Sequence, residues 1–359
     1  MKLKTLASLC LIAFVASAHA QTYSVIHAFS NGSDGQFPYA GVTLRGGALY
    51  GTTESGPGGY ALYNGTVYQL KQQGSNWVLS TISIFPGDRS GGANPYAGVV
   101  FGPDGRPYGI ATYGGDVQGN GVVFSLTPPV SLCKTARCAS GNWTENVLHE
   151  FAGNPDGRMP GYGNVTFDSQ GNLYGTTYAG GAYYDSGTVF QMTKAGNTWT
   201  ETPIYSFNFF NQPANGYSPQ SGVIIDANGN LFGTTLAGGS NNLDYGTVFE
   251  LTNVPGVGWQ ETVLYSFQGT TDGSYPYAGL VSDSSGNLYG ATTDGGRGGA
   301  GTLFELSLSG NTWTFTLLYS FSGQPGPKLW TMGNVDHGRL RQSLRHDQVF
   351  RCESVWQCF

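Results

Sequence analysis

Tyrosines that stand near carboxylates are the residues of this sequence best suited to bind a ligand. A flat aromatic ring can stack on a sugar or a peptide group, while a nearby carboxylate or amide fixes its orientation. One set follows proline-bearing polar segments and comprises Tyr39, Tyr96, Tyr162, Tyr217 and Tyr277. A second set lies in glycine-rich segments and comprises Tyr60, Tyr63, Asp116, Tyr183, Tyr184, Asp185, Asp244, Tyr245 and Asp294. The competing and simpler interpretation is that the tyrosines pack inside the fold and the acids are solvated.

Catalytic chemistry would need acids or histidines that break the sequence pattern. A glycosidase uses a pair of carboxylates, but most acids here recur at equivalent places in turn motifs. These acids are Asp34, Asp156, Asp168, Asp226, Asp272 and Asp283. His27 and His149 are also equivalent to each other, which indicates variation within a repeat rather than a general base. Because no nucleophile elbow, Walker loop or metal-ligand cluster is apparent, we predict no catalytic residue, no metal and no cofactor.

A tandem repeat must position these residues. Apolar segments that end in phenylalanine recur about every 56 residues along the chain. Their closing residues are Phe29, Phe85, Phe151, Phe207, Phe267 and Phe321. The one long interval contains Cys133 and Cys138, for which we predict a local disulfide rather than a metal site, since an exported chain meets an oxidising environment.

Each interval has the same internal order, which predicts four strands. In the last interval they are 279–281, 288–292, 301–306 and 313–321. The turn at 283–287 has the form Asp-x-x-Gly-Asn, in which glycine supplies the positive φ of a hairpin loop. The Gly-Thr-Leu-Phe segment at 301–304 alternates small or polar with apolar residues, as a strand does.

Four antiparallel strands at this period are typical of a propeller blade. We predict an all-β fold, a β-propeller of four-stranded blades over residues 21–321, with five complete blades and an incomplete sixth. The predicted blades span 40–85, 97–151, 161–207, 221–267 and 278–321, and 23–29 is an orphan outer strand. A β-solenoid is the alternative, although its coils are usually shorter.

The two ends of the chain differ from the repeat. Residues 1–20 have the basic start, apolar stretch and Ala18-His19-Ala20 cleavage site of a signal peptide. We therefore expect a secreted protein, extracellular or periplasmic, cleaved after Ala20. Residues 322–359 are atypical and arginine-rich. Codons for 335–359 can be chosen that encode Gly-Asn-Leu-Tyr-Gly-Thr-Thr one base downstream, so we predict a frame-shifted, poorly ordered tail that sequencing of the gene would test.

Several motifs resemble those of the choice-of-anchor tandem repeat GloVer-containing proteins, which are exported bacterial proteins. The carriers are Gly-Asn-Leu-Tyr-Gly-Thr-Thr at 171–177, Gly-Thr-Val-Phe at 187–190 and Leu-Tyr-Ser-Phe at 264–267. The resemblance covers residues 23–321. It implies export, often with a surface-anchoring signal, and it implies no particular activity.

Three hypotheses about function follow. The leading one is a non-catalytic extracellular or cell-surface binding or scaffold module, a monomer whose ligand is a glycan or a protein. The second is a secreted carbohydrate-active hydrolase, and the third is a frame-damaged copy without function. With a net charge of -6 and only 11% charged residues, the chain lacks the basic stripe that a nucleic-acid partner requires.

Overall fold

The computed structural model describes residues 24–30, 32–56, 64–86, 90–115, 118–129, 143–210, 215–240 and 243–322. The signal peptide, the predicted Cys133–Cys138 disulfide, Tyr60, Tyr63, Asp116 and the segment 323–359 lie outside these residues. The described chain is all β, without an α-helix. Within it, no helix has the length and apolar character needed to cross a membrane.

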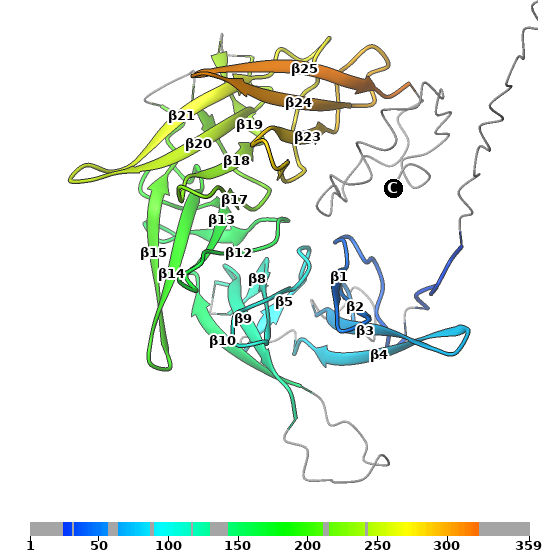
Figure 1. Cartoon of the computed structure of the whole chain (residues 1–359). Helices are drawn as coiled ribbons and strands as arrows, with labels where there is room; N and C mark the ends of the chain where they lie inside the picture. Colours follow the sequence, from blue (N-terminus) through cyan, green and yellow to red (C-terminus); the bar gives the residue numbers. More distant parts are fainter. Residues whose placement is uncertain are drawn as a thin grey trace, which may run out of the picture.

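Five antiparallel sheets follow one another as the blades of a propeller (Figure 1). Blade 1 contains β1 (Thr43–Arg45), β2 (Ala48–Thr53), β3 (Thr66–Gln73) and β4 (Asn76–Ile84). Blade 2 contains β6 (Val100–Phe101), β7 (Pro107–Ala111), β9 (Val122–Thr127) and β10 (Thr144–Glu150). Blade 3 contains β12 (Thr166–Phe167), β13 (Leu173–Ala179), β14 (Thr188–Ala195) and β15 (Thr198–Ser206).

The last two blades repeat this order. Blade 4 contains β17 (Ile224–Ile225), β18 (Leu231–Thr235), β20 (Thr247–Val254) and β21 (Gly258–Ser266). Blade 5 contains β22 (Val281–Ser282), β23 (Leu288–Thr292), β24 (Thr302–Ser309) and β25 (Thr312–Ser320). In blades 2, 3 and 4, a short strand in the loop before the blade pairs with the end of the second strand or with the segment that follows it. These pairs are β5 (Gly92–Ala93) with β8 (Tyr113–Gly114), β11 (Arg158–Pro160) with β13, and β16 (Gly216–Tyr217) with β19 (Ala237–Gly238).

The all-β class and the succession of five blades agree with the prediction from the repeat. Residues 24–30, predicted as part of an orphan outer strand, form no strand in the described chain. Phe29 nevertheless packs against Tyr68 of β3, with ring centroids 5.1 Å apart. The first blade thus receives an aromatic contact from the segment that precedes it.

Phenylalanines at the ends of the fourth strands form the core between blades. Phe207 follows β15 and packs edge-on against Phe249 of β20 in the next blade, at 5.3 Å between centroids. Both side chains are fully buried. The same contact recurs as Phe85–Phe124, Phe151–Phe190 and Phe267–Phe304. Blades 2 to 5 are therefore each completed by a ring from the blade before them.

The glycine in the middle of each second strand makes room for the third-strand aromatic ring. A β-carbon on Gly233 would lie 2.6 Å from the ring of Phe249, which is too close for a carbon contact. The same close approach recurs for Gly51, Gly109, Gly175 and Gly290. The Leu-Tyr-Gly-Thr-Thr motif therefore needs glycine for space rather than for a left-handed backbone.

The two threonines of that motif have different partners. The hydroxyl of Thr176 in β13 donates to the carbonyl oxygen of Ser221 at the entrance of blade 4, at 2.7 Å. The hydroxyl of Thr177 instead bonds with that of Thr188 in β14, at 2.8 Å. The first threonine thus links neighbouring blades, and the second links strands within a blade.

Candidate functional site

A pocket of about 270 Å³ lies along the inner strands of the propeller. Tyrosines from the segments that lead into blades 1, 2, 3 and 5 converge on it, namely Tyr39, Tyr96, Tyr162 and Tyr277. Phe101, Phe167 and Ile224 of the inner strands and the amide-bearing Asn164 complete much of its wall. No charged residue belongs to the described lining, so the pocket offers rings, hydroxyls and an amide to a ligand.

The tyrosine rings of the pocket contact one another. The centroids of Tyr39 and Tyr96 are 5.7 Å apart, and those of Tyr96 and Tyr162 are 4.6 Å apart in an edge-to-face arrangement. The Tyr96 hydroxyl donates to Oε1 of Glu54 at 2.7 Å. Burial, followed by this bond and the Glu54 charge, raises the pKa of Tyr96, and burial raises the pKa of Tyr162 to about 12. Both hydroxyls are therefore neutral at physiological pH.

Blade 4 departs from the tyrosine pattern. We grouped Tyr217 with the entrance tyrosines, but the pocket lining does not include it. Its hydroxyl donates instead to Asp244 at 2.9 Å. Gln220 follows Pro219 as Tyr96 follows Pro95, so it occupies the entrance position. The Oε1 atom of Gln220 is buried and has no hydrogen-bond partner in the described chain.

The acids of the second predicted set hold loops together. Asp185 pairs with Arg158 and accepts a hydrogen bond from the backbone of Gly180. Asp244 accepts one from the backbone N–H of Gly238 at 2.7 Å. These bonds close the loops between second and third strands in blades 3 and 4, which is a structural task. In blade 5, Asp294 accepts from the Thr293 hydroxyl at 3.1 Å and pairs with Ser274 through the backbone.

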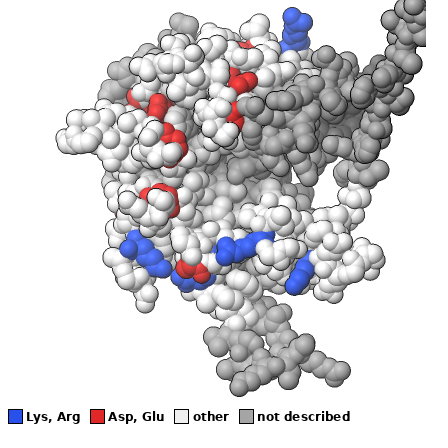
Figure 2. All heavy atoms as spheres, viewed as in Figure 1, with Lys and Arg blue, Asp and Glu red and all other residues white. Residues whose placement is uncertain are grey.

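The remaining predicted tyrosines lie away from the pocket lining. Tyr184 is 73% exposed and meets Phe210 edge-on at 4.2 Å, while its neighbour Tyr183 is also exposed. Tyr245 lies 6.2 Å from Tyr275, measured between ring centroids. The structure therefore brings together Tyr39, Tyr96, Tyr162 and Tyr277, and it disperses the second set. In Figure 2 the Lys and Arg side chains on the described part of the face seen in Figure 1 lie mostly in a row along its lower part, with an acidic side chain among them, and the other Asp and Glu side chains lie above this row.

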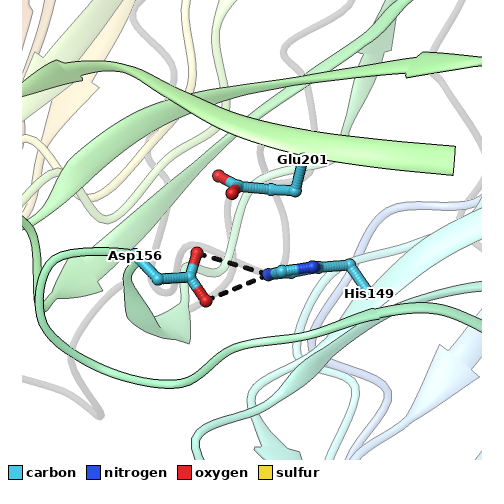
Figure 3. A group of neighbouring side chains, drawn as sticks. All are labelled: His149, Asp156 and Glu201. Atoms are coloured by element: carbon cyan, nitrogen blue, oxygen red, sulfur yellow. Dashed lines mark hydrogen bonds and ion pairs between the residues drawn. The ribbon is translucent and has the colours of Figure 1, made fainter.

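A histidine and two carboxylates form a second group, between blades 2 and 3 (Figure 3). Nε2 of His149, in β10, lies 3.1 Å from Oδ2 and 3.3 Å from Oδ1 of Asp156. Glu201 approaches from β15 of the adjacent blade, with its carboxylate alongside that of Asp156 (Figure 3). One ligand atom from each residue lies within 4.8 Å of the others.

The carboxyl group of Glu201 has one oxygen without a hydrogen-bond partner among the described residues. Its Oε1 atom is buried without a hydrogen bond in the described chain. Burial raises the pKa of Glu201 far above its ordinary range, and the negative charge of Asp156 and a hydrogen bond with its side chain add to the effect. Without a cation in the group, Glu201 therefore keeps its proton at neutral pH.

Sequence reasoning missed this group because Glu201 is distant in the chain from His149 and Asp156. His149 was interpreted as variation of the repeat, and Asp156 as a turn residue. A signal was nevertheless present, since a Trp-x-Glu motif occurs in the fourth strands at 143–145, 199–201 and 259–261. That glutamate faces the preceding blade, which the spacing within one repeat does not reveal.

A comparison with known protein families identifies the repeat. A family model described as the Gloeobacter/Verrucomicrobia repeat matches residues 135–340. PorZ, a surface component of the type-IX secretion system of Porphyromonas gingivalis, is 17% identical with a TM-score of 0.44, and the alignment covers 82% of this chain but only 36% of PorZ. No curated protein sequence matches the chain.

Two carbohydrate-active enzymes are similarly distant. A polysaccharide lyase of family PL25, an ulvan lyase, is 13% identical with a TM-score of 0.47, covering 81% of this chain and 74% of that one. An endo-arabinase from Bacteroides thetaiotaomicron is 14% identical with a TM-score of 0.40, covering 83% and 100% respectively. At these values the likeness carries no inference about activity.

Proposed function

Because this chain belongs to the Gloeobacter/Verrucomicrobia repeat family and its repeats build propeller blades, we propose that it is a non-catalytic extracellular or cell-surface binding module. Its ligand is a neutral, hydroxyl-rich group, such as one unit of a glycan, held in the tyrosine-lined pocket. The observation that carries this proposal is the convergence of Tyr39, Tyr96, Tyr162 and Tyr277 on one pocket without a charged residue in its described lining.

The chemistry of the pocket supports a sugar rather than an ion. Tyrosine rings present flat apolar faces, and their neutral hydroxyls both donate and accept hydrogen bonds. Asn164 adds an amide, which also bonds to hydroxyl groups in either sense. A volume of about 270 Å³ is close to the lower end of ordinary small-molecule sites and suits a single ring.

The alternative, a carbohydrate-active hydrolase, would need a pair of carboxylates beside the ligand. Glu54 is the carboxylate tied to the pocket through the hydroxyl of Tyr96, and the described lining contains no acid. Asp156 and Glu201 do form a close pair, but they lie beside the outer strands of two blades. Binding without turnover is therefore the better account of the pocket.

A glycan array followed by calorimetric titration tests the proposal. We expect the full chain to bind neutral saccharides and to leave them intact in a turnover assay. The variant Tyr162→Ala should weaken binding at least tenfold, since stacking on an aromatic ring contributes about 1.4 kcal/mol or more. The variant Tyr184→Ala, altered at an exposed loop, should bind as the parent does.

Two outcomes would contradict the proposal. One is hydrolysis of a saccharide that Tyr162→Ala abolishes, which would favour the enzyme. The other is the absence of any glycan ligand in a protein that unfolds cooperatively on heating. A chain that shows no cooperative unfolding would instead support the hypothesis of a frame-damaged copy.

A further inference from the structure

The group of His149, Asp156 and Glu201 joins two adjacent blades with chemistry that the repeat does not otherwise combine. We propose that these three side chains bind one divalent metal ion, zinc in preference to calcium or magnesium, between β10 and β15. Imidazole nitrogen together with carboxylate oxygen is a donor set typical of zinc, and a water would complete a four-coordinate site.

The distances suit such an ion. Donor atoms bound to one tetrahedral zinc at about 2.0–2.2 Å lie about 3.3 Å from one another. Nε2 of His149 and the two oxygens of Asp156 are hydrogen-bonded at 3.1 and 3.3 Å in this structure, so one zinc ion would take the place of the proton between them with little change in these separations. Glu201 lies within 4.8 Å of both partners, so a small movement of its side chain would complete the set.

The first two ligands are held in position by the fold. The His149 ring meets Phe151 edge-on, with centroids 4.8 Å apart. Asp156 accepts a hydrogen bond from the backbone N–H of Ala152 at 2.8 Å. The His149 and Asp156 side chains remain 22% and 16% exposed, which leaves a path for an ion from solvent. Support of this kind is what metal ligands generally require.

The unpartnered oxygen of Glu201 is the second observation that points to a cation. A buried carboxyl oxygen without a donor is unfavourable, because it has given up its contacts with water for nothing in return. It lies on a side chain whose carboxyl group faces that of Asp156, and a cation between the two groups would bond to both.

The repeat supplies matched positions in which the set of three ligands is incomplete. His27 pairs with Asp34 at 3.2 Å, but Leu79 stands where Glu201 stands in blade 3. Tyr265 donates to Asp272 at 2.7 Å, and Phe315 occupies the glutamate position. Tyr205 donates to Glu261, and Asn215 stands at the start of the Asn-Gly turn that replaces Asp-Gly. In the described chain, histidine, aspartate and glutamate meet only between blades 2 and 3.

The test is calorimetric titration of the full chain after removal of metal with a chelator. Zinc chloride should bind with one equivalent in this group. Calcium and magnesium chloride should bind at least tenfold more weakly. Zinc should also raise the unfolding temperature.

Three variants locate the site. Glu201→Gln and His149→Tyr should each weaken zinc binding at least thirtyfold and abolish its effect on the unfolding temperature. His149→Tyr places at this position the residue found at Tyr205 and Tyr265, so the blade interface should still form. His27→Tyr changes the matched histidine of the incomplete group and should leave zinc binding as it is.

X-ray absorption at the zinc edge separates this site from the thiols of Cys352 and Cys358, which lie outside the described residues. We expect nitrogen and oxygen ligands without sulfur. The proposal would be overturned by no zinc binding in the parent chain, by sulfur in the coordination shell of its single zinc, or by full zinc affinity in both Glu201→Gln and His149→Tyr. A loss of zinc in His27→Tyr that equals the loss in His149→Tyr would do the same.

Discussion

The hydroxyl of Tyr205 in β15 donates a hydrogen bond to Oε2 of Glu261 in β21, at 2.7 Å. This bond crosses from blade 3 to blade 4 at the outer strands. The other carboxylate oxygen, Oε1 of Glu261, is buried without a partner in the described chain. Burial raises the pKa of Glu261 to about 7, against the opposing effect of hydrogen bonds from Tyr205 and from the backbone of Gly216.

Glu261 should make stability depend on pH in a defined direction. The folded chain binds the proton of Glu261 more tightly than the unfolded chain does, so the stabilising effect is complete below the unfolded pKa and is lost as pH rises through about 7. The variant Glu261→Gln lacks this titration. Its free energy of unfolding, relative to the parent, should therefore be higher at pH 8 than at pH 4, by about 3 kcal/mol. Urea titrations at both pH values measure the difference, and an equal difference at both would contradict it.

Removal of the Tyr205 hydroxyl tests how much its hydrogen bond to Glu261 contributes to stability. Tyr205→Phe leaves Glu261 without its side-chain donor, and we expect a loss of about 1–3 kcal/mol in the free energy of unfolding. Tyr184→Phe removes a hydroxyl from an exposed side chain and should change stability by less than about 0.5 kcal/mol. Equal effects of the two variants would show that the bond across the blades adds nothing.

The close approach of Gly233 to Phe249 predicts that replacing this glycine with alanine destabilises the strand. Alanine is ordinarily the better residue in a strand, but its β-carbon would meet the Phe249 ring at 2.6 Å. Gly233→Ala should therefore destabilise the protein by about 1–3 kcal/mol. If the clash is the cause, Phe249→Leu should cost less in the Gly233→Ala background than alone, which a double-mutant cycle in urea would measure. Additive effects would exclude the clash.

The phenylalanine contacts between blades predict that Phe207→Ala lowers the free energy of unfolding more than Phe29→Ala does. Phe207→Ala empties a fully buried contact with the next blade and should cost about 3–5 kcal/mol. Phe29→Ala removes the equivalent contact with Tyr68, but Phe29 is only half-buried. Its loss should be clearly smaller. Thermal unfolding of both variants measures the order, and the reverse order would contradict this account of the core.

The sequence predicted the blades because their determinants are local. The Asp-x-x-Gly-Asn turns behave as expected, and Gly171, Gly229 and Gly286 have φ values of 82 to 86°. The role of Gly233 was not predictable, since it depends on how Phe249 lies across two strands. The meeting of His149 with Glu201 was hidden for a similar reason, because it depends on the pairing of neighbouring blades. The tyrosine pocket was partly predictable. The repeat indicates which tyrosines are equivalent, but their meeting in one pocket depends on how the blades are arranged around the propeller.

The phenylalanine that ends each fourth strand has a consequence for how such chains can be recombined. Phe207 belongs by sequence to the third repeat, yet its ring is housed by the fourth. If a single blade were transferred to another chain, its terminal phenylalanine would lack the packing site that the next blade provides. Its own packing site would likewise lack the phenylalanine that the preceding blade provides. Exchange of blades between relatives should therefore succeed only when both aromatic residues that pack at a boundary between blades are exchanged together. The smallest exchangeable segment is then one that includes this boundary, not a single sheet.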